Sequence, residues 1–551
     1  MWEAILCETM TPSSISSSDA ATDRPVLDGA AQLGELATGL YGPDGRDKLV
    51  VTDRETVVTG DLHQLFDTLD LRDPGARIAA NAAVQQKEAA GDGSVAVVLL
   101  TGSLATRADD LLERGLHRAT IADGYHRGQR AAVAALADLE TPAGGLDGSR
   151  GRAAIRSALG RANDVAGSVA TVIEAARLVH DARARRDGGI GIERIDFQHR
   201  AGATAPRVEL RRGLVLEREA VTPNTPRRVE DARIAIVGGG KKAGRGIEER
   251  ELKRTGGSTG KGRTEVAVQA ATPDDLDAFR QHEADDVAAQ VQRLVQADVD
   301  VVFTTMGISD RAIAALDSAG ITAFRALQAG QARRVSRATG AKVVMQSTEF
   351  EPEDVGTAGL VAAESGDDPV VRIEDCPESG VGTLLVTGAL QTDATSLQRE
   401  LMTGIATARS ILDGTHLVPG GGGAWIELAA AVRDAATTVA DRSAVAMEAY
   451  ADALEDLPRT LVRNSGADPI DVLARLRAAE GAVFDGERNE VRAADEHGPY
   501  DLAPVVESSV TAASDVAIQF VRIDETLPAA AEPEPDVDEE SLQPDPERDV
   551  A

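Results

Sequence analysis

Apolar side chains recur at helical spacing in the first third and in the last third of the chain. The runs 107–125 and 127–140 place apolar residues every three or four positions, which is the spacing of one face of an α-helix. A further helical pattern ends near Arg183, and helical spacing returns over 397–463 and 469–479. The pattern predicts two mainly helical parts, one toward each end of the chain.

The middle of the chain alternates between strand and helix patterns. Residues 188–240 are rich in β-forming side chains, and Thr272 followed by Pro273 has the residue types of a helix start. Further along, strand patterns and one helical pattern alternate at 299–305, 309–318, 321–326 and 341–345. This alternation predicts an α/β unit. One helical domain made from both chain ends, with the middle inserted into it, would explain the order of the elements.

Both termini have the composition of disordered segments. Residues 1–24 are rich in Ser, Thr and Asp, and 528–551 form a proline-rich tail with nine carboxylates. No apolar run is long enough to span a bilayer, and the first residues are too short and too acidic for a signal peptide. The two cysteines, Cys7 and Cys376, exclude a disulfide framework. We therefore expect a cytoplasmic protein without a membrane partner.

The charge balance is strongly acidic. Ninety acidic residues stand against 58 basic ones, which gives a net charge of -32. Such self-repulsion destabilises a compact state in dilute buffer, whereas about 1 M salt shortens the Debye length to about 3 Å. The composition therefore predicts a salt-adapted, halophile-like protein. It also argues against nucleic acid as a partner, because nucleic-acid binding relies on basic side chains.

A basic, glycine-rich excursion at 238–263 contains four of the seven lysines. Its segment TGGSTGKGRT (255–264) is not a P-loop. Thr255 stands where the first glycine is required, and Gly262 follows Lys261 where a Ser or Thr would ligate Mg²⁺. The excursion is interpreted as a solvated loop, and contact with an acidic partner remains the alternative.

Three other short stretches have the residues that can hold a phosphate chain. They are YGPDGRDK (41–48), GDGSV (91–95) and VPGGGGAWIEL (418–428). Glycine allows close approach of the backbone to a ligand, and a helix N-terminus offers free N–H groups. A carboxylate in such a loop can ligate Mg²⁺. Each stretch alone is more often a simple turn.

Taken together and in this order, the stretches resemble the group II chaperonins, the thermosome-like family of archaea and of the eukaryotic cytosol. The resemblance runs from about Gly39 to Glu525. Besides the three stretches, it includes the segments 55–77, 91–104, 225–237, 349–361, 464–477 and 521–525.

The resemblance implies an α+β multidomain fold with an inserted domain. A mainly helical equatorial domain that binds ATP would comprise 25–141 and 398–527. A small intermediate domain would comprise 142–212 and 366–397. An inserted α/β apical domain with a helical protrusion would comprise 213–365, and this places TGGSTGKGRT in or near that protrusion.

The resemblance also assigns site residues, with ATP, Mg²⁺ and optionally K⁺ as the implied ligands. Asp61 would orient the water that attacks ATP, and Asp92 would ligate Mg²⁺. The remaining assignments are nucleotide contacts, at Gly42, Pro43, Gly45, Asp92, Gly93, Ser94, Arg161, Gly421 and Gly422. Among these, Arg161 stands roughly where the family has a phosphate-sensing lysine, and Gly421 and Gly422 would lie near the base and ribose.

Several positions depart from the family pattern. The second water-orienting Asp is replaced by Met402 or Thr403, depending on a one-residue gap. The expected run of Thr hydroxyls after GDG is reduced to Ser94, and Ala503 replaces an acidic residue. Two hypotheses stay open. The chain is an ATP-driven folding chaperone subunit of a double ring that binds unfolded proteins, or it is a structural or regulatory subunit of a hetero-oligomeric ring that hydrolyses little ATP.

Overall fold

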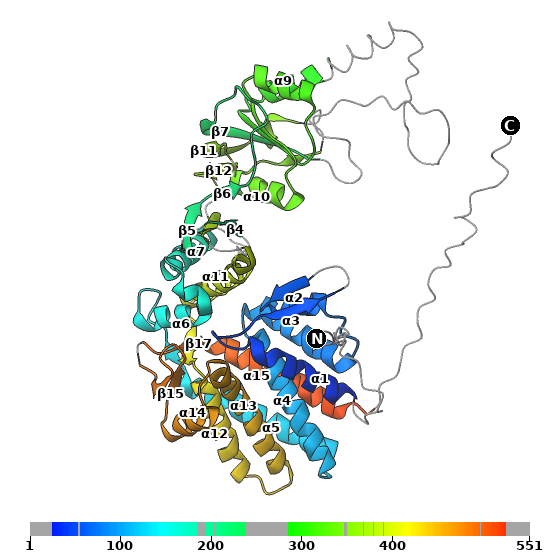
Figure 1. Ribbon diagram of the computed structural model, residues 1–551, viewed down its shortest axis with the longest axis vertical. Coiled ribbons are helices and arrows are strands. Elements are labelled where there is room, and N and C mark those ends of the chain that lie inside the picture. Colours follow the sequence, from blue (N-terminus) through cyan, green and yellow to red (C-terminus); the bar gives the residue numbers. More distant parts are fainter. Residues whose placement is uncertain are drawn as a thin grey trace, which may run out of the picture.

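Three lobes follow one another along the molecule (Figure 1). We name them the lower lobe (25–142 and 413–524), the middle lobe (143–212 and 382–412) and the upper lobe (213–381). The computed structural model describes residues 25–52, 56–184, 194–202, 205–238, 285, 287–345, 350–366, 369–377, 380–388, 391–495 and 497–524. The N-terminal segment 1–24, the tail 528–551, Thr272 and the basic excursion beyond Gly238 lie outside these residues.

The lower lobe is a bundle of helices from both ends of the chain. Its long helices are α1 (Pro25–Ala37), α3 (Pro74–Ala90), α4 (Ser94–Glu113), α5 (Arg118–Leu139), α12 (Gly423–Thr437), α13 (Ser443–Asn464) and α15 (Ala503–Arg522). Apolar side chains from both parts share one core, in which the rings of Tyr125 and Tyr450 meet edge to face at 5.8 Å. The prediction of helical ends is therefore confirmed.

The helical pattern at 107–125 belongs to two helices. Gly115 has φ +81°, a conformation that favours glycine, and it follows the end of α4. The ring of His117 then accepts a hydrogen bond from the N–H of Ala119 and caps α5. Apolar spacing alone does not reveal this break, because both helices contribute to the same core.

Short elements lie between the long helices of the lower lobe, and several of them line the cavity described below. They are η1 (Thr38–Leu40), β1 (Lys48–Val51), β2 (Thr56–Thr59), α2 (Leu62–Thr68), β3 (Thr141–Pro142), β14 (His416–Pro419), α14 (Pro469–Ala478), β15 (Ala482–Asp485), β16 (Glu490–Ala493) and β17 (Tyr500–Leu502). Strands β17, β14 and β3 form one sheet, and β1–β2 and β15–β16 are antiparallel hairpins. The helix predicted at 469–479 is confirmed as α14.

The middle lobe combines two distant segments through a three-stranded sheet. Strand β13 (Gly382–Thr387) runs parallel to β4 (Ile195–Arg200) and antiparallel to β5 (Arg207–Arg212). The lobe's helices are α6 (Ser149–Leu159), η2 (Gly160–Asp164), α7 (Ser168–Ala184) and α11 (Gln391–Leu412). Helix α11 continues past the predicted boundary at 397/398, because both Leu397 and Leu401 are buried in the core of this lobe.

The upper lobe is a seven-stranded mixed sheet flanked by helices. Its path is β6 (Leu214–Leu216), β12 (Val370–Glu374), β11 (Gly356–Glu364), β7 (Arg228–Val237), β8 (Val301–Thr304) and β9 (Thr322–Phe324), with β10 (Val343–Val344) beside β7. The helices are the segment 287–296, α9 (Asp310–Ser318), α10 (Ala329–Thr339) and η5 (Pro352–Asp354). The predicted strand and helix alternation over 299–345 is confirmed.

Strand β12 places part of a predicted intermediate segment in the upper lobe. It pairs with β11 in an antiparallel register from Leu360↔Glu374 to Glu364↔Val370. Val371 and Ile373 are buried in the upper core. The lobe therefore extends beyond the predicted edge at residue 365, because a hairpin partner buries its apolar side chains where its neighbour does.

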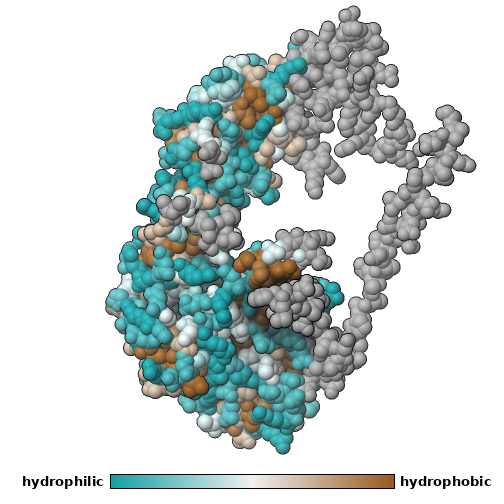
Figure 2. Space-filling view, in the orientation of Figure 1, coloured by the Kyte–Doolittle hydropathy of each residue, from teal (hydrophilic) through white to brown (hydrophobic). Residues whose placement is uncertain are grey.

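The visible surface is mostly hydrophilic (Figure 2). An apolar patch lies over the β1–β2 hairpin, where Leu49, Val51 and Val58 are more than half exposed. Among the described residues, no helix combines the length and the apolar character that a membrane crossing requires.

Candidate functional site

A cavity of about 420 Å³ lies where the lower lobe meets the middle lobe. Its walls come from segments that are hundreds of residues apart in sequence, including α4 and α12 of the lower lobe and α6 and α11 of the middle lobe. All ten residues predicted from the sequence as site residues line it: Gly42, Pro43, Gly45, Asp61, Asp92, Gly93, Ser94, Arg161, Gly421 and Gly422.

The turn at 41–45 has no room for side chains at its glycines. Gly42 has φ +88°, and a Cβ atom there would lie 2.4 Å from Cδ1 of Leu461. A Cβ on Gly45 would lie 2.6 Å from the carbonyl oxygen of Leu40. The N–H of Gly45 donates to the carbonyl oxygen of Gly42 at 3.0 Å, which closes the turn. The backbone of this turn can therefore approach a ligand closely.

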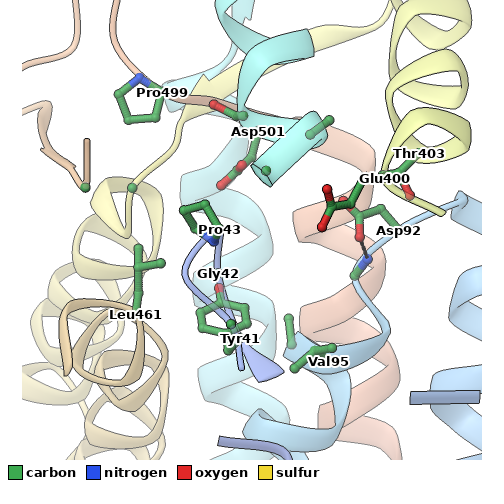
Figure 3. A pocket seen from close by; sticks show the side chains of 18 of the residues that line it. Tyr41, Gly42, Pro43, Asp92, Val95, Glu400, Thr403, Leu461, Pro499 and Asp501 are labelled. Carbon is green, nitrogen blue, oxygen red and sulfur yellow. Dashed lines mark hydrogen bonds between the residues drawn. The ribbon is translucent and has the colours of Figure 1, made fainter. Parts of the chain in front are cut away.

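The GDG segment joins the end of α3 to the start of α4. Gly91 and Gly93 have φ values of +77° and +89°, and Gly93 is the N-cap of α4 without a side-chain cap. Asp92 lies between them, and its Oδ1 accepts a hydrogen bond from the N–H of Gly93 at 2.7 Å (Figure 3). Ser94, Val95 and Ala96, the first residues of α4, line the cavity, and the first N–H groups of a helix have no partner within the helix.

A second helix N-terminus opens on the same cavity. Gly421 and Gly422 have φ values of +57° and +83°, and Gly422 caps α12, again without a side-chain cap. A Cβ on Gly421 would lie 2.2 Å from the carbonyl oxygen of Phe484, so this position accepts only glycine. These two helix N-termini, whose glycine caps offer no side-chain hydrogen bond, provide N–H groups and positive dipole ends, which is an arrangement that favours anionic groups.

Asp61 is held by two interactions. It is the N-cap of α2, and its Oδ1 accepts from the N–H of Gln64 at 2.9 Å. Its Oδ2 lies 3.3 Å from Nε of Arg399 on α11. Both paired side chains are 23% exposed, so Asp61 is fixed yet still reaches the cavity.

The two residues considered for the position of the second Asp lie in different surroundings. Thr403 lines the cavity, whereas Met402 packs against the core of the middle lobe. Thr403 Oγ1 accepts a hydrogen bond from Nζ of Lys87 at 3.2 Å. This position therefore carries a hydroxyl and a neighbouring ammonium group, and no carboxylate.

Arg161 connects two cavity carboxylates that sequence reasoning did not single out. Its guanidinium lies 3.4 Å from Oδ1 of Asp47 and 3.6 Å from Oε1 of Glu400. Glu400 precedes Thr403 by three residues, so both share one face of α11. A search for carboxylates one helical turn from the missing Asp would have found Glu400.

Asp501, on β17, is another cavity carboxylate that the sequence reasoning missed. Burial, together with the smaller effect of the nearby charge of Asp92, raises its pKa from the ordinary value of 3.8 to about 7. Asp501 points into the cavity in Figure 3. Asp501 lies two residues before Ala503, the position at which the family pattern has an acidic residue. An acidic residue so close to that position was the signal in the sequence that could have identified Asp501.

The raised pKa of Asp501 predicts a pH-dependent cost to stability. Between pH 4 and pH 7 the folded chain holds a proton there that the unfolded chain has lost, so stability falls as pH rises through this window. We expect Asp501→Asn, which cannot ionise, to stabilise the protein at pH 8 by about 2 kcal/mol, half of the full linkage value, because Asp501 is partly exposed to solvent.

Thermal unfolding at pH 8 and pH 5, in the same concentration of potassium chloride, tests this prediction. The advantage of Asp501→Asn over the parent chain shrinks at pH 5, because Asp501 is then protonated in the folded chain. An equal advantage at both pH values would show that Asp501 does not titrate in this range.

Known proteins match this chain over nearly its whole length. The family model described as the TCP-1/cpn60 chaperonin family matches residues 33–531. Thermosome subunit 3 of Haloferax volcanii is 31% identical over 522 residues, which cover 92% of this chain and 95% of the relative. Thermosome subunit alpha of Archaeoglobus fulgidus is 31% identical, covering 91% and 90%. The thermosome subunit of Pyrococcus abyssi is 28% identical, covering 90% and 89%.

Proposed function

This chain belongs to the TCP-1/cpn60 chaperonin family and is a group II chaperonin, and from that premise we propose that its cavity binds and hydrolyses ATP to drive the folding of client proteins. One observation carries the proposal. Ten residues selected from sequence motifs far apart in the chain line one cavity, beside two helix N-termini capped by glycine. Such convergence of phosphate-compatible backbone is expected of a nucleotide site.

The residues present fit a nucleotide with its metal ion. The turn at 42–45 and the N-terminus of α4 offer backbone to phosphates, and Asp92 offers the oxygen ligand that Mg²⁺ prefers. Bound Mg²⁺ would neutralise phosphate charge. Apolar side chains on the cavity wall, including Leu461 and Phe484, suit a base.

Charged side chains in the cavity suit phosphoryl transfer, in which positioning and charge stabilisation supply most of the catalysis. Asp61 is held by its cap interaction and by Arg399, so it can orient a water molecule. Arg161 and Lys87 bring positive charge to the cavity wall. The alternative, a subunit that hydrolyses little ATP, receives less support, because Asp61, Asp92 and Arg161 all line the cavity.

The lobes suggest how the site is coupled to a larger assembly. We assign the lower, middle and upper lobes to the equatorial, intermediate and apical domains, with clients bound by the upper lobe. We expect the chain to assemble into rings with copies of itself or with related subunits. The exposed apolar hairpin β1–β2 supports this, because an unpaired apolar strand edge is normally covered by a partner.

ATP turnover by the purified chain in about 1 M potassium chloride tests the proposal. Nucleotide binding is followed in the same sample, and Mg²⁺ is removed with a chelator as a control. We expect binding, and turnover of about 0.1 s⁻¹, which is below the ordinary range for enzymes because the second Asp is absent. A well-folded chain that neither binds nor hydrolyses ATP would overturn the proposed function.

A further inference from the structure

The missing second carboxylate has a candidate replacement on the same helix. Thr403 cannot polarise a water molecule as a carboxylate does, yet Glu400 lines the same cavity one helical turn earlier. We propose that Glu400 is a catalytic residue that orients the attacking water together with Asp61. This inference rests on the proposed function of the cavity as an ATP site.

The face of α11 that meets the cavity includes Glu400. The residues of this helix that line the cavity are Arg399, Glu400, Thr403 and Thr407, which follow helical spacing. Asp61 is anchored at the same turn, because its partner Arg399 directly precedes Glu400. Asp61, from the lower lobe, therefore contacts the turn of α11 that carries Glu400. Lys87 contacts the next turn of the same helix, at Thr403.

Glu400 faces the turn at 42–45 across Gly160. A Cβ built on Gly160 would lie 3.9 Å from Cδ of Glu400 and 3.8 Å from Cα of Pro43. Figure 3 shows the Glu400 side chain pointing from α11 into the cavity, on the side where Pro43 and Asp92 lie. Glu400 therefore lies on the side of the cavity from which a water molecule would approach a phosphate held by the turn at 42–45.

The Glu400 side chain is held in place, yet its carboxylate can still accept further hydrogen bonds. Its Oε2 accepts a hydrogen bond from the N–H of Ala162 at 2.7 Å, and its Oε1 lies 3.6 Å from Nε of Arg161. A carboxylate has about four acceptor positions, so it can also accept from a water molecule. Holding such a group in one rotamer is what positioning of a reactant requires.

The surroundings of Glu400 also favour proton acceptance. Burial raises the pKa of its carboxyl group above the ordinary value, while the charges of Arg161 and Arg399 oppose that rise. A carboxylate whose pKa lies closer to the working pH is a better general base. A purely structural alternative exists, in which Glu400 only holds Arg161 in place.

Glu400→Gln separates the two roles. The amide oxygen of glutamine can still accept from the N–H of Ala162, but the negative charge is lost. We expect kcat for ATP to fall by about 10- to 100-fold and KM to change by less than about threefold, because water activation acts in the transition state. Glu400→Asp, which keeps the charge, should retain more kcat than Glu400→Gln.

Two comparison variants make the test specific. Glu427 on α12 is a partly buried carboxylate that accepts from the N–H of Gly481 at 2.9 Å, outside the cavity, so Glu427→Gln should leave kcat unchanged. Arg161→Gln should raise KM, because it removes a cation from the cavity wall. If Glu400 only held Arg161, Glu400→Gln would raise KM in the same way, and this result would overturn the inference.

The outcome also distinguishes this inference from the proposed function. Turnover by the parent chain with undiminished kcat in Glu400→Gln would leave the ATP site standing and reject the role of Glu400. Absence of ATP binding by the parent chain would reject both. A selective loss of kcat in Glu400→Gln, partly restored in Glu400→Asp, would support the inference.

Discussion

Replacing Asp61 with alanine is expected to lower kcat for ATP by about 10²- to 10⁴-fold, the usual contribution of a positioned acid or base. The reason is that Asp61 is the carboxylate held at the cavity by a cap hydrogen bond and by Arg399. Nucleotide affinity should change little, since water orientation acts mainly in the transition state. Steady-state turnover and equilibrium binding of ATP, measured on the same preparation, check both statements.

Asp61→Ala also removes a helix cap, and this effect needs a control. Asp468 caps α14 in the same way, because its side chain accepts from the N–H of Ile470 at 2.8 Å, and it lies outside the cavity. Asp468→Ala should cost about 1 kcal/mol of stability and leave turnover unchanged. Undiminished turnover in a folded Asp61→Ala variant would show that Asp61 does not orient the attacking water.

Lowering potassium chloride from about 2 M to about 0.1 M is expected to lower the midpoint of thermal unfolding by more than about 10 °C. The net charge of -32 repels itself over a Debye length that grows from a few ångströms to about 10 Å across this range. The face of the molecule that Figure 2 shows is largely hydrophilic over the described residues. Thermal unfolding followed by circular dichroism at several salt concentrations measures the effect.

A neutral solute distinguishes charge screening from a general solute effect. Sucrose stabilises proteins by exclusion from their surface and does not screen charge. We expect sucrose at matched osmolarity and low salt to recover only a minor part of the lost stability. Full recovery in sucrose, or equal midpoints at high and low salt, would contradict adaptation to salt by charge.

The sequence predicted the elements whose signals are local. The helix patterns at both ends and the strand and helix alternation over 299–345 appear in the structure, because each depends on spacing within a few residues. The GDG segment was also recognisable, because a backbone with positive φ requires glycine and so leaves a mark in the sequence. Both of its glycines have positive φ, and Gly93 caps α4. The burial of side chains between lobes left no such local signal. For this reason β12 and the part of α11 after residue 397 lie in other lobes than the predicted domain boundaries place them.

The sequence by itself determined which residue types were available for the site: the glycines, Asp61, Asp92 and the lack of an aspartate near 403. Only the tertiary structure decided how they combine. It brought Arg399 to Asp61, turned Met402 into the core, and placed Glu400 in the cavity. The physical reason is that these contacts join segments hundreds of residues apart, and no spacing along the chain encodes which of them will share a wall.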